Sequence, residues 1–578
     1  MGALVTLLSI GCSSCSKDPS SGDGDGGGNS GKVIYTVDIG GMNDEERVAV
    51  IALQGLVNRG GTRIMVEPKN AGGFYGTGYQ NMPSNIVQNG IDPISEARMK
   101  YASIEDVWKE FYKDKYDYSF VTMSFQKIFE QFADAYKGVV VYESLDADAG
   151  IAIATTACGV LDGVPVTESL MKKYPFLADA PVLENLTEHG FASRVAAHEW
   201  AVAQYLDKCS TKGAYSYWAP ERNYFTIDYA VNQKLFSFSL RYDNAQYCEE
   251  GYTYDPAEVE VMDRIFAHLD LGSNVFGWGM SPENVMQGRI GQGGHVLICT
   301  NASPNLSFHA NLGIAGQPMK QKRQPHDVTL ENKVYITFTS HEGDTYKCLG
   351  NLVNDGMWLH DRRGDIPFNW AMNPQLLTLL PGLADYYYTE LTDNDYVISP
   401  TTGLGHYDAT YSTEEMRTMF ASRNREYFNL MDQHYMDIWW NNFEGRDEWI
   451  ASMGVDGFTT WVEYETVNYT TAVTNIESEM YYDLYWPPTE HDPEVMAAYI
   501  LGQGNKPQVV GLPWFIHVYA CDPTFAYRVM QNLPADRFEA VCMDDFFALA
   551  ELARPQIEGI TLREDTSLIT TSMKDQLF

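Results

Sequence analysis

Short apolar runs alternate with segments of helical periodicity along most of the chain, starting at residue 33. Val33–Ile39 and Arg63–Glu67 have the length and composition of buried strands. Between them, Asn43–Asn58 carries apolar residues at helical spacing, with an asparagine at its start that can cap the helix and Gly60 just beyond its end. A strand, a helix and a second strand in this order predict a βαβ unit with parallel strands.

The same alternation continues and predicts further small α/β units. Up to residue 166 the expected elements are helix Ile104–Tyr112, strand Tyr118–Met123, helix Lys127–Tyr136, strand Val139–Tyr142, helix Ala149–Val160 and strand Val164–Val166. A third block begins near Ser193 and contains strand Leu235–Ser239, helix Pro256–His268 and strand His295–Thr300. The basic, proline-containing stretch Gln317–Asp327 then has the composition of a connector.

Beyond this connector, strands and helices alternate from Lys333 to about Ala553. This length is close to the roughly 250 residues of a βα barrel. Candidate barrel strands end near Ser340, Tyr388, Ser399, Trp461, Tyr519 and Cys542. The tract Tyr386–Tyr388 is interpreted as a buried strand, and Trp439-Trp440, beside Asp437, as part of a helix core, with a groove lining as the alternative.

The predicted fold class is therefore a multidomain α/β protein, with small N-terminal βαβ domains followed by a C-terminal TIM-like βα barrel. The predicted division is a signal and linker at 1–31, three N-terminal α/β domains at 32–100, 101–190 and 191–322, a barrel at 323–555 and a tail at 556–578.

Composition and charge narrow the class of partner. Hydrophobic residues make up 45% of the 578 residues and charged residues 20%, which is typical of globular proteins and excludes a largely disordered chain. The formal net charge of −37 disfavours nucleic acid and anionic membrane surfaces, because phosphate binding needs clustered Lys and Arg. Aromatic residues make up 13%, which suits stacking on sugar rings, although a large aromatic core explains the same composition.

The first 31 residues predict a lipoprotein of the cell envelope. Ala3–Ile10 is an apolar run too short to span a bilayer and is typical of a secretion signal. Cys15, after Ser13-Ser14, fits best as the cysteine that is lipidated and becomes the mature N-terminus, and Cys12 is the alternative. A flexible linker, Asp18–Gly31, follows. We expect an extracytoplasmic protein, periplasmic or at the cell surface, that touches membrane only through this anchor.

Motifs for cofactors and metals are missing from the sequence. Gly291–Gly294 precedes a strand instead of following one, so it is not a dinucleotide loop. There is no P-loop, GxSxG elbow or HExxH, and the scattered cysteines lack zinc spacing. His341 beside Glu342 and Asp344 lacks the second histidine of a typical metal site. We therefore expect neither a cofactor nor a metal.

Carboxylates follow five predicted strands of the C-terminal region, at the strand ends where βα barrels carry their active sites. They are Glu342 and Asp344, Asp408, Glu463 and Glu465, Asp522, and Asp544 with Asp545. Convergent carboxylates suit glycoside hydrolysis, in which one protonates the leaving oxygen and another acts as base or nucleophile. Each can instead cap the following helix, and Asp522 and the Asp544-Asp545 pair fit that role best.

Several short segments stand in a fixed order along the chain. They are Leu53–Arg59 (Leu-Gln-Gly-Leu-Val-Asn-Arg), Asp228–Ala230, Gly277-Trp278, Val334–Asp344, Ile366–Trp370, Leu380-Pro381 and Tyr386–Tyr388. In these segments, from about residue 33 to 553, the chain resembles the GxGYxYP family of glycoside hydrolases, found among bacterial glycan-utilisation proteins. The resemblance implies small α/β domains before a βα barrel, a glycan substrate, and proteins of glycan uptake as neighbours.

Both loops expected at the active site depart from the family pattern. In the naming motif, Gly403 and Gly405 are the two glycines of the family pattern. His406 and Asp408 then stand where the family has tyrosines, with Tyr407 at the variable position between them, and Ala409 stands where the family has proline. After Ser340, where the family has Ser-Asp-Gly-Asp-Asn, Asp344 is kept and Glu342 is the acid nearest the missing aspartate. The departures imply either altered substrate choice or lost activity.

The leading hypothesis is a glycoside hydrolase of an extracytoplasmic oligo- or polysaccharide. The expected catalytic acids are Asp344 and Glu342, with Asp408 and Glu463 as partners. The expected substrate-binding residues are His341, His406, Tyr407, Trp461, Tyr464, His517 and Asp522. Two alternatives stay open: a glycan-binding lipoprotein without catalysis on the same scaffold, and a metal-dependent deacetylase using His341 and Asp344.

Overall fold

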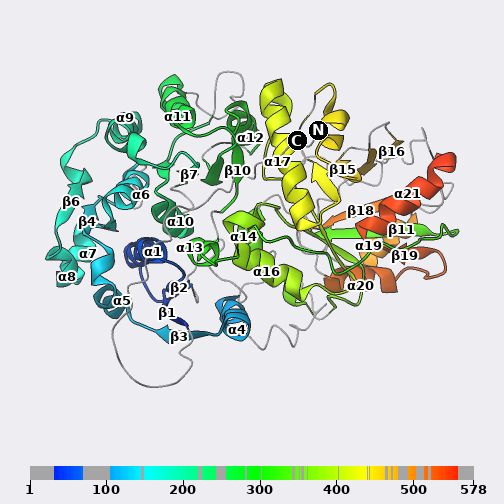
Figure 1. Cartoon of the computed structure of the whole chain (residues 1–578), viewed down its shortest axis with the longest axis horizontal. Coiled ribbons are helices and arrows are strands. Elements are labelled where there is room, and N and C mark those ends of the chain that lie inside the picture. The colour runs from blue at the N-terminus through cyan, green and yellow to red at the C-terminus, as the bar shows by residue number, and fades with distance from the viewer. Residues whose placement is uncertain are drawn as a thin grey trace, which may run out of the picture.

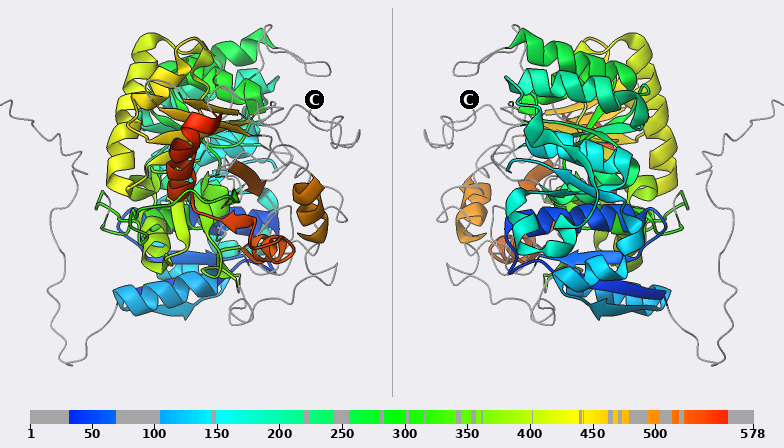
Figure 2. Two further views of the ribbon diagram at one scale, coloured as in Figure 1. Left: turned by 90° about the vertical axis from the view of Figure 1, so that its right-hand side faces the viewer. Right: turned by 90° about the vertical axis from the view of Figure 1, so that its left-hand side faces the viewer.

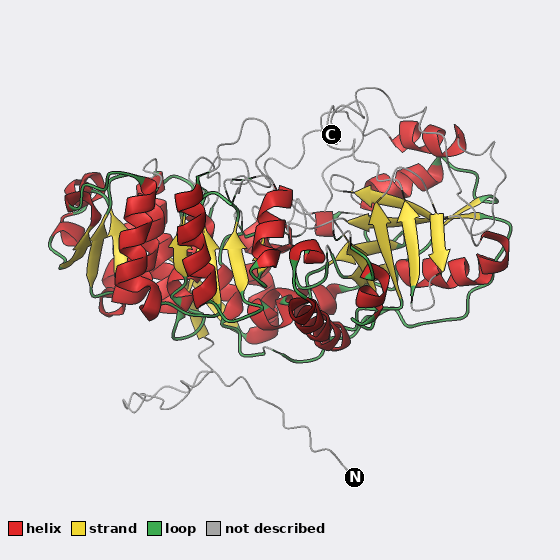
Figure 3. Cartoon of the chain, turned by 90° about the horizontal axis from the view of Figure 1, so that it is seen from above, coloured by secondary structure: helices red, strands yellow, loops and turns green. Residues whose placement is uncertain are grey.

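The structure, a computed structural model, is a mixed α/β assembly of several mostly parallel sheets (Figure 1). It describes residues 32–68, 104–144, 149–218, 224–242, 255–279, 281, 283–300, 303–314, 316–340, 345–350, 352, 357–360, 362–400, 402–438, 441, 443–461, 466–469, 473–478, 493–502, 513–518 and 523–557. Figure 3 separates two groups of strands, one in each half of the molecule, with helices around and between them.

The first sheet joins strands that lie far apart in the sequence. β1 (Lys32–Asp38) lies between β2 (Ile64–Glu67) and β3 (Tyr118–Thr122), and both pairings are parallel. The helices of this region are α1 (Asp44–Asn58), α4 (Ile104–Tyr116) and α5 (Phe125–Gln131). Because β3 pairs with β1, this sheet extends across the domain boundary expected at residue 100.

The second sheet has β4 (Gly138–Val141) at its centre, with β5 (Gly163–Val166) on one side and β6 (Val182–Asn185) on the other. All three strands are parallel. The chain reaches β5 through α6 (Gly150–Leu161) and then crosses to the far side of β4 through α7 (Glu168–Lys173) and α8 (Pro175–Ala178). The connections that leave β4 and β6 therefore begin at the carboxyl ends of two neighbouring parallel strands.

A third parallel sheet has the order β10-β9-β7-β8. Its strands are β7 (Gly213–Ser216), β8 (Phe236–Phe238), β9 (Asn274–Gly277) and β10 (Val296–Ile298). The associated helices are α9 (Arg194–Tyr205), α10 (Ile227–Gln233), α11 (Pro256–His268), α12 (Glu283–Gln292) and α13 (Leu306–Ala310). Its strands come from within the predicted 191–322 region.

The C-terminal region holds two sheets. One has the parallel order β13-β12-β11-β18, with β19 also paired to β11, and the other has the order β14-β15-β17-β16. The strands are β11 (Val334–Ser340), β12 (Phe368–Ala371), β13 (Asp395–Ile398), β14 (Tyr435–Ile438), β15 (Gly457–Trp461), β16 (Thr466–Tyr469), β17 (Thr474–Ser478), β18 (Pro513–Val518) and β19 (Phe538–Ala540). A parallel bridge between Ser399 and Met436 continues the strand sequence from β13 to β14.

Helices surround these strands on several sides. They are α14 (Thr345–Gly350), α15 (Leu376–Leu379), α16 (Pro381–Glu390), α17 (Glu414–Met431), α18 (Arg446–Ala451), α19 (Pro493–Gly502), α20 (Pro523–Gln531) and α21 (Met543–Ile557). The two views of Figure 2 place α17 and α19 on opposite sides of the molecule. Within the described residues no sheet closes on itself, so the predicted βα barrel goes beyond what the structure shows. None of the described helices has the length and apolar character that crossing a bilayer requires.

The structure corrects the interpretation of two segments. The tyrosines at 386–388, expected in a strand, lie in α16, where all three are buried. A run of buried aromatic residues satisfies strand propensity, but Pro381 at the first helical position and burial on every side favour a helix that is packed all round. The residues directly before Trp439-Trp440, a pair interpreted as helix core, form β14, a strand of four residues that is too short for its periodicity to be recognised. Asp437 lies in this strand, and Trp439 and Trp440 themselves lie outside the described residues.

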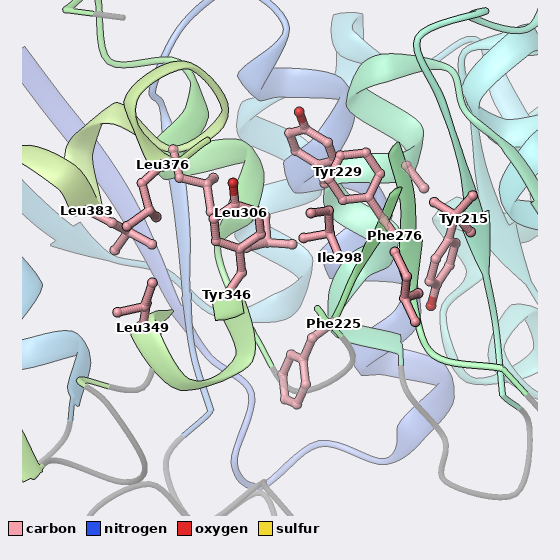
Figure 4. Close-up of a cluster of buried hydrophobic side chains, with 14 of the residues drawn as sticks. Tyr215, Phe225, Tyr229, Phe276, Ile298, Leu306, Tyr346, Leu349, Leu376 and Leu383 are labelled. Carbon is pink, nitrogen blue, oxygen red and sulfur yellow. The ribbon is translucent and has the colours of Figure 1, made fainter. Parts of the chain in front are cut away.

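The third sheet and the C-terminal region share one hydrophobic core. Figure 4 shows Ile298 of the third sheet next to Tyr346 of the C-terminal region, with Leu376 on the side of Tyr346 and with Phe276 and, farther away, Tyr215 on the other side. All five of these side chains are buried and belong to the same continuous cluster. The two regions are therefore held to each other by apolar packing as well as by the polar contacts described below.

The signature Leu53–Arg59 proves to be a structural junction in α1. The Asn58 amide donates to the Ile64 carbonyl (2.9 Å) and the Ser307 hydroxyl (3.0 Å), and the Gln54 amide donates to Asn305 Oδ1 (2.7 Å). Arg59, at the end of α1, donates to Asp162 and to three main-chain carbonyls of α6 and α10. These polar side chains satisfy buried carbonyls of neighbouring elements, so the signature reflects architecture.

Replacing Gly55 by alanine is expected to lower the free energy of unfolding by roughly 2–4 kcal/mol. A Cβ at this position would stand 2.2 Å from the Asp228 main-chain oxygen, so α1 and α10 would have to separate. Gly159→Ala is the matched control, because this helical glycine has its nearest neighbouring atom at 3.4 Å. Urea denaturation of both variants measures the free energies of unfolding, and equal values for the two variants would contradict the prediction.

Asp228 is expected to make stability depend on pH. Its buried carboxylate accepts the N–H groups of Tyr229 (2.6 Å) and Ser307 (2.7 Å), and burial raises the pKa of Asp228 to about 7. Between the unfolded value of 3.8 and about 7, the native state holds a proton that the unfolded state lacks. The contribution of Asp228 to the free energy of unfolding therefore falls as pH rises through this window.

The variant Asp228→Asn removes this titration. The free energy of unfolding of this variant, minus that of wild type, should rise by roughly 2–4 kcal/mol as the pH increases from 4 to 8. Taking the difference cancels the opposite effect of His198 and His295, whose pKa values burial lowers to about 4. Asp536→Asn, at an exposed carboxylate, is the control. A difference that stays constant with pH would show that Asp228 does not titrate in this range.

Candidate functional site

The candidate site lies at the carboxyl ends of β11 to β15, where parallel sheets present their loops. Among the predicted residues, Trp461 is the last residue of β15, and His517 lies in β18 paired with Thr339 of β11. Three of them, His406, Tyr407 and Asp408, lie in one described loop after β13. The other predicted residues lie outside the described residues: Cys12, Cys15, His341, Glu342, Asp344, Glu463, Tyr464 and Asp522.

We call residues 402–409 the motif loop. They correspond to the family's naming motif, in the altered form described above. Its backbone turns sharply, with positive φ values at Thr402 (63°) and Gly403 (86°). A Cβ at Gly403 would stand 1.9 Å from Asn424 Oδ1. A Cβ at Gly405 would stand 2.6 Å from the Ile298 side chain of β10. The two glycines are required because the loop passes directly against buried neighbours.

Buried side-chain amides hold the motif loop in place. The amides of Asn373 and Gln375, which follow β12, both donate to the Leu404 carbonyl, at 2.8 and 2.7 Å. The Asn424 carbonyl oxygen accepts the Leu404 N–H at 3.0 Å. On the other flank, Asn441 accepts the Ala409 N–H at 2.6 Å and donates to the Tyr407 carbonyl at 3.0 Å. The loop is therefore fixed through its main chain.

The motif loop also joins the third sheet. His406 and Leu297 of β10 exchange two main-chain hydrogen bonds of 3.0 Å, forming an isolated antiparallel bridge. The His406 side chain is 1% exposed, lies 3.0 Å from the Gln287 amide through Nδ1, and meets the Trp278 ring edge to face. Glu283 Oε1 lies 3.6 Å from the same nitrogen. His406 thus contacts α12 and the strand end of β9.

Tyr407 and Asp408 have structural partners. The Tyr407 ring is buried and stacks on Phe420 of α17, with centroids 4.0 Å apart, and burial raises the pKa of its phenol. The Asp408 carboxylate accepts the Thr410 N–H at 2.9 Å and so caps η8 (Ala409–Tyr411). Asp408 therefore has the capping role that was the alternative to catalysis for these strand-end acids. Sugar binding by His406 and Tyr407 and catalysis by Asp408 stay predictions.

A buried carboxylate at the same edge was not predicted from the sequence as a site residue. Asp437, near the end of β14, is 1% exposed, and its Oδ1 accepts the Thr459 hydroxyl at 3.1 Å. Its main-chain oxygen accepts the Thr402 N–H at the start of the motif loop. Recognising Tyr435–Ile438 as a strand would have placed this acid beside the loop.

One described group of side chains has the spacing of a metal site. Oxygen or nitrogen atoms of His326, Asp544 and Asp545 lie within 4.8 Å of one another. Arg323 already pairs with both carboxylates, at 2.9 Å from Asp544 and in closer contact with Asp545. Burial and the neighbouring Asp544 raise the pKa of Asp545. The Arg323 guanidinium already neutralises the negative charge that would hold a metal cation. The group is therefore an ion-pair network at the first turn of α21.

Comparison with known families identifies the chain. Residues 332–551 match the model described as "GxGYxYP putative glycoside hydrolase C-terminal domain", and residues 213–311 match the "GxGYxYP third domain". The two matches cover more than half of the chain. The chain belongs to the GxGYxYP family. The sequence-based prediction of the family is thereby confirmed.

A solved structure shares the fold. The crystal structure of "a putative hydrolase" from Bacteroides thetaiotaomicron VPI-5482 is similar over 90% of this chain and 95% of that chain, with 18% sequence identity and a TM-score of 0.70. A comparison with curated proteins finds no match. The family name points to a hydrolase. The motif loop, on which the family name rests, serves here to join two regions of the fold.

Proposed function

We propose that this chain hydrolyses glycosidic bonds in an extracytoplasmic oligo- or polysaccharide. The observation that carries the proposal is the membership of residues 332–551 in a family named for glycoside hydrolysis. In this proposal Asp344 and Glu342, two residues apart after β11, supply the principal carboxylates, and Glu463 after β15 is a partner. One carboxyl group protonates the leaving oxygen, while another activates water or attacks the sugar carbon.

The order of the strands supports this location of the site. β11, β12 and β13 are neighbours in chain order, and the Ser399–Met436 bridge leads on to β14 and then β15. Loops after these strands therefore meet at one edge, as they do in a βα barrel, and we include barrel closure in the proposal. The rigid motif loop and the buried Asp437 border the same edge, so the reacting groups would lie on a fixed support.

Attachment through a lipidated Cys15, or Cys12, places the reaction outside the cytoplasm in this proposal. Metabolic labelling with an alkyne fatty acid tests it: wild type should be labelled, and the variant that lacks the modified cysteine should not. Label in the double variant Cys12→Ala/Cys15→Ala would contradict an anchor at these positions. Pull-down of glycan-uptake proteins with the anchored form tests the expected neighbours.

The test of the function is a hydrolysis screen of the purified chain against plant, fungal, bacterial and host glycans. Release of reducing ends above a heat-inactivated control is the expected result. Unchanged activity in a chelator would exclude the metal-dependent deacetylase, whereas acetate release without reducing ends would favour it. Binding of a glycan without release of reducing ends would favour the non-catalytic binding protein and contradict the proposal.

A further inference from the structure

The second sheet carries a cavity that the reaction described above does not use. Its volume is about 330 Å³, at the lower end of the range for small-molecule sites. One wall comes from the chain after β4, with Glu143, Gly150 and Ile153. The opposite wall comes from the chain after β6, with Phe191 and Arg194 among its residues. The cavity thus lies between two connections that begin at neighbouring strand ends.

The position in the fold is one where open α/β sheets bind ligands. β5 lies on one side of β4 and β6 on the other, so the order in which strands are added to the sheet reverses at β4. Ligands of open α/β sheets occupy the crevice at the carboxyl ends of strands at such a reversal. The cavity occupies that crevice, and the first turns of α6 and α9 border it.

The aromatic wall is held rigidly. The Phe191 ring stacks on His189 with centroids 5.2 Å apart and 18° between the planes, and Trp200 packs against both rings. The His189 imidazole lies 3.0 Å from Glu184 through Nε2. Phe191 is half-buried and lines the cavity, so it offers an apolar ring surface whose orientation is set before a ligand arrives.

The charges at the cavity favour a neutral ligand. Arg194 lines it, but its guanidinium pairs with the buried Glu258 at 3.2 Å, so its positive charge is balanced. Glu143 brings a carboxylate to the same cavity and disfavours a second anion there. Thr187 and Ser193 add hydroxyl groups. A carboxylate, a paired guanidinium and hydroxyls around an aromatic face are suited to the hydroxyls and apolar face of a sugar ring.

We propose that this cavity binds one neutral sugar ring of a glycan chain. The inference rests on the proposed function, because that function makes a glycan the ligand of this chain. Figure 1 places β4, β6, α6 and α9 at one end of the molecule and β11, β18 and α21 at the other. The cavity is therefore an ancillary site, remote from the carboxyl ends of β11 to β15, that would retain a polymer while other parts of it are cleaved.

The test is titration calorimetry of the full chain with a fixed panel of neutral sugars: methyl hexosides, pentosides and N-acetylhexosaminides and their trisaccharides. We expect at least one member to bind and Phe191→Ala to weaken it roughly tenfold. Glu143→Gln, at an exposed side chain whose loss leaves packing intact, should weaken the same sugar. Glu188→Gln is the matched control, because this exposed carboxylate of the same region does not line the cavity.

Hydrogen exchange locates the binding. The sugar should slow amide exchange at the start of α6 and α9 in wild type and not in Phe191→Ala. No binding by any panel member at millimolar concentration, or binding indifferent to both cavity variants, would overturn the inference. Displacement of the sugar by inorganic phosphate would overturn the assignment to a neutral ligand. Hydrolysis without cavity-dependent binding refutes only this inference, whereas cavity-dependent binding without hydrolysis refutes only the proposed function.

Discussion

Asp344→Asn is expected to lower the rate of glycan hydrolysis by roughly 10²–10⁴-fold with little change in stability. Asp344 follows β11, the strand that pairs with β12, β18 and β19 and is buried along its whole length. It is also the acid that the family pattern retains in this loop. An amide keeps the size of the side chain but can neither release a proton nor carry the negative charge that the reaction needs.

The control for this variant is Asp536→Asn, which makes the same chemical change at an exposed residue shortly before β19, at the opposite ends of the strands. Its activity should equal that of wild type. Glu342→Gln and Glu463→Gln then identify the partner acid, since the true partner should lose activity to a similar extent. If Asp344→Asn keeps full activity on a substrate from the screen, the chemistry belongs to other carboxylates, and Asp437 becomes the first of them to examine.

Gly403→Ala should destabilise the chain by roughly 3–5 kcal/mol. Two costs combine at this position. The backbone has φ of 86°, where a residue with a Cβ is strained, and the Cβ would stand 1.9 Å from Asn424 Oδ1. Asn424 is fully buried and bonds the Leu404 N–H and the Phe420 carbonyl, so moving it away would leave buried polar groups without partners.

Gly445→Ala separates these two costs. Gly445 has nearly the same φ, 81°, but nothing lies within 4 Å of an added Cβ, so only the backbone strain of about 1 kcal/mol should remain. In a second comparison, Asn424→Ala should relieve the steric part, so the double variant with Gly403→Ala should be more stable than additive costs predict. Thermal and urea unfolding provide both measurements, and equal losses in Gly403→Ala and Gly445→Ala would contradict the close contact.

Local sequence signals predicted the N-terminal elements well. Asn43 caps α1, as the sequence suggested, and the structure adds that Glu46 returns the bond. β1, β2 and α11 lie within a residue of their predicted bounds. The pairing of β3 with β1 could not be predicted, because their pairing depends on contacts distant in sequence. Tyr386–Tyr388 were assigned to a strand because a run of buried aromatic residues satisfies strand propensity, and the structure shows them in a helix packed all round.

For the candidate site, the sequence located the loops but not the roles of their side chains. The two glycines of the motif marked the loop after β13, yet whether Asp408 faces a substrate or caps a helix depends on the position of Thr410. Asn373, Gln375 and Asn424 carry no chemical motif, and their importance appears only when their partner, Leu404, is seen. Polar residues that satisfy buried main chain have no signature in a single sequence.

The bridge between Leu297 and His406 has an evolutionary consequence. Main-chain hydrogen bonds, a glycine pressed against Ile298 and a shared aromatic core all cross from the third sheet to the C-terminal region. Gene fusion could not exchange the C-terminal region for that of a distant relative without also replacing the strand that meets the motif loop. We expect the two regions to be inherited as one module.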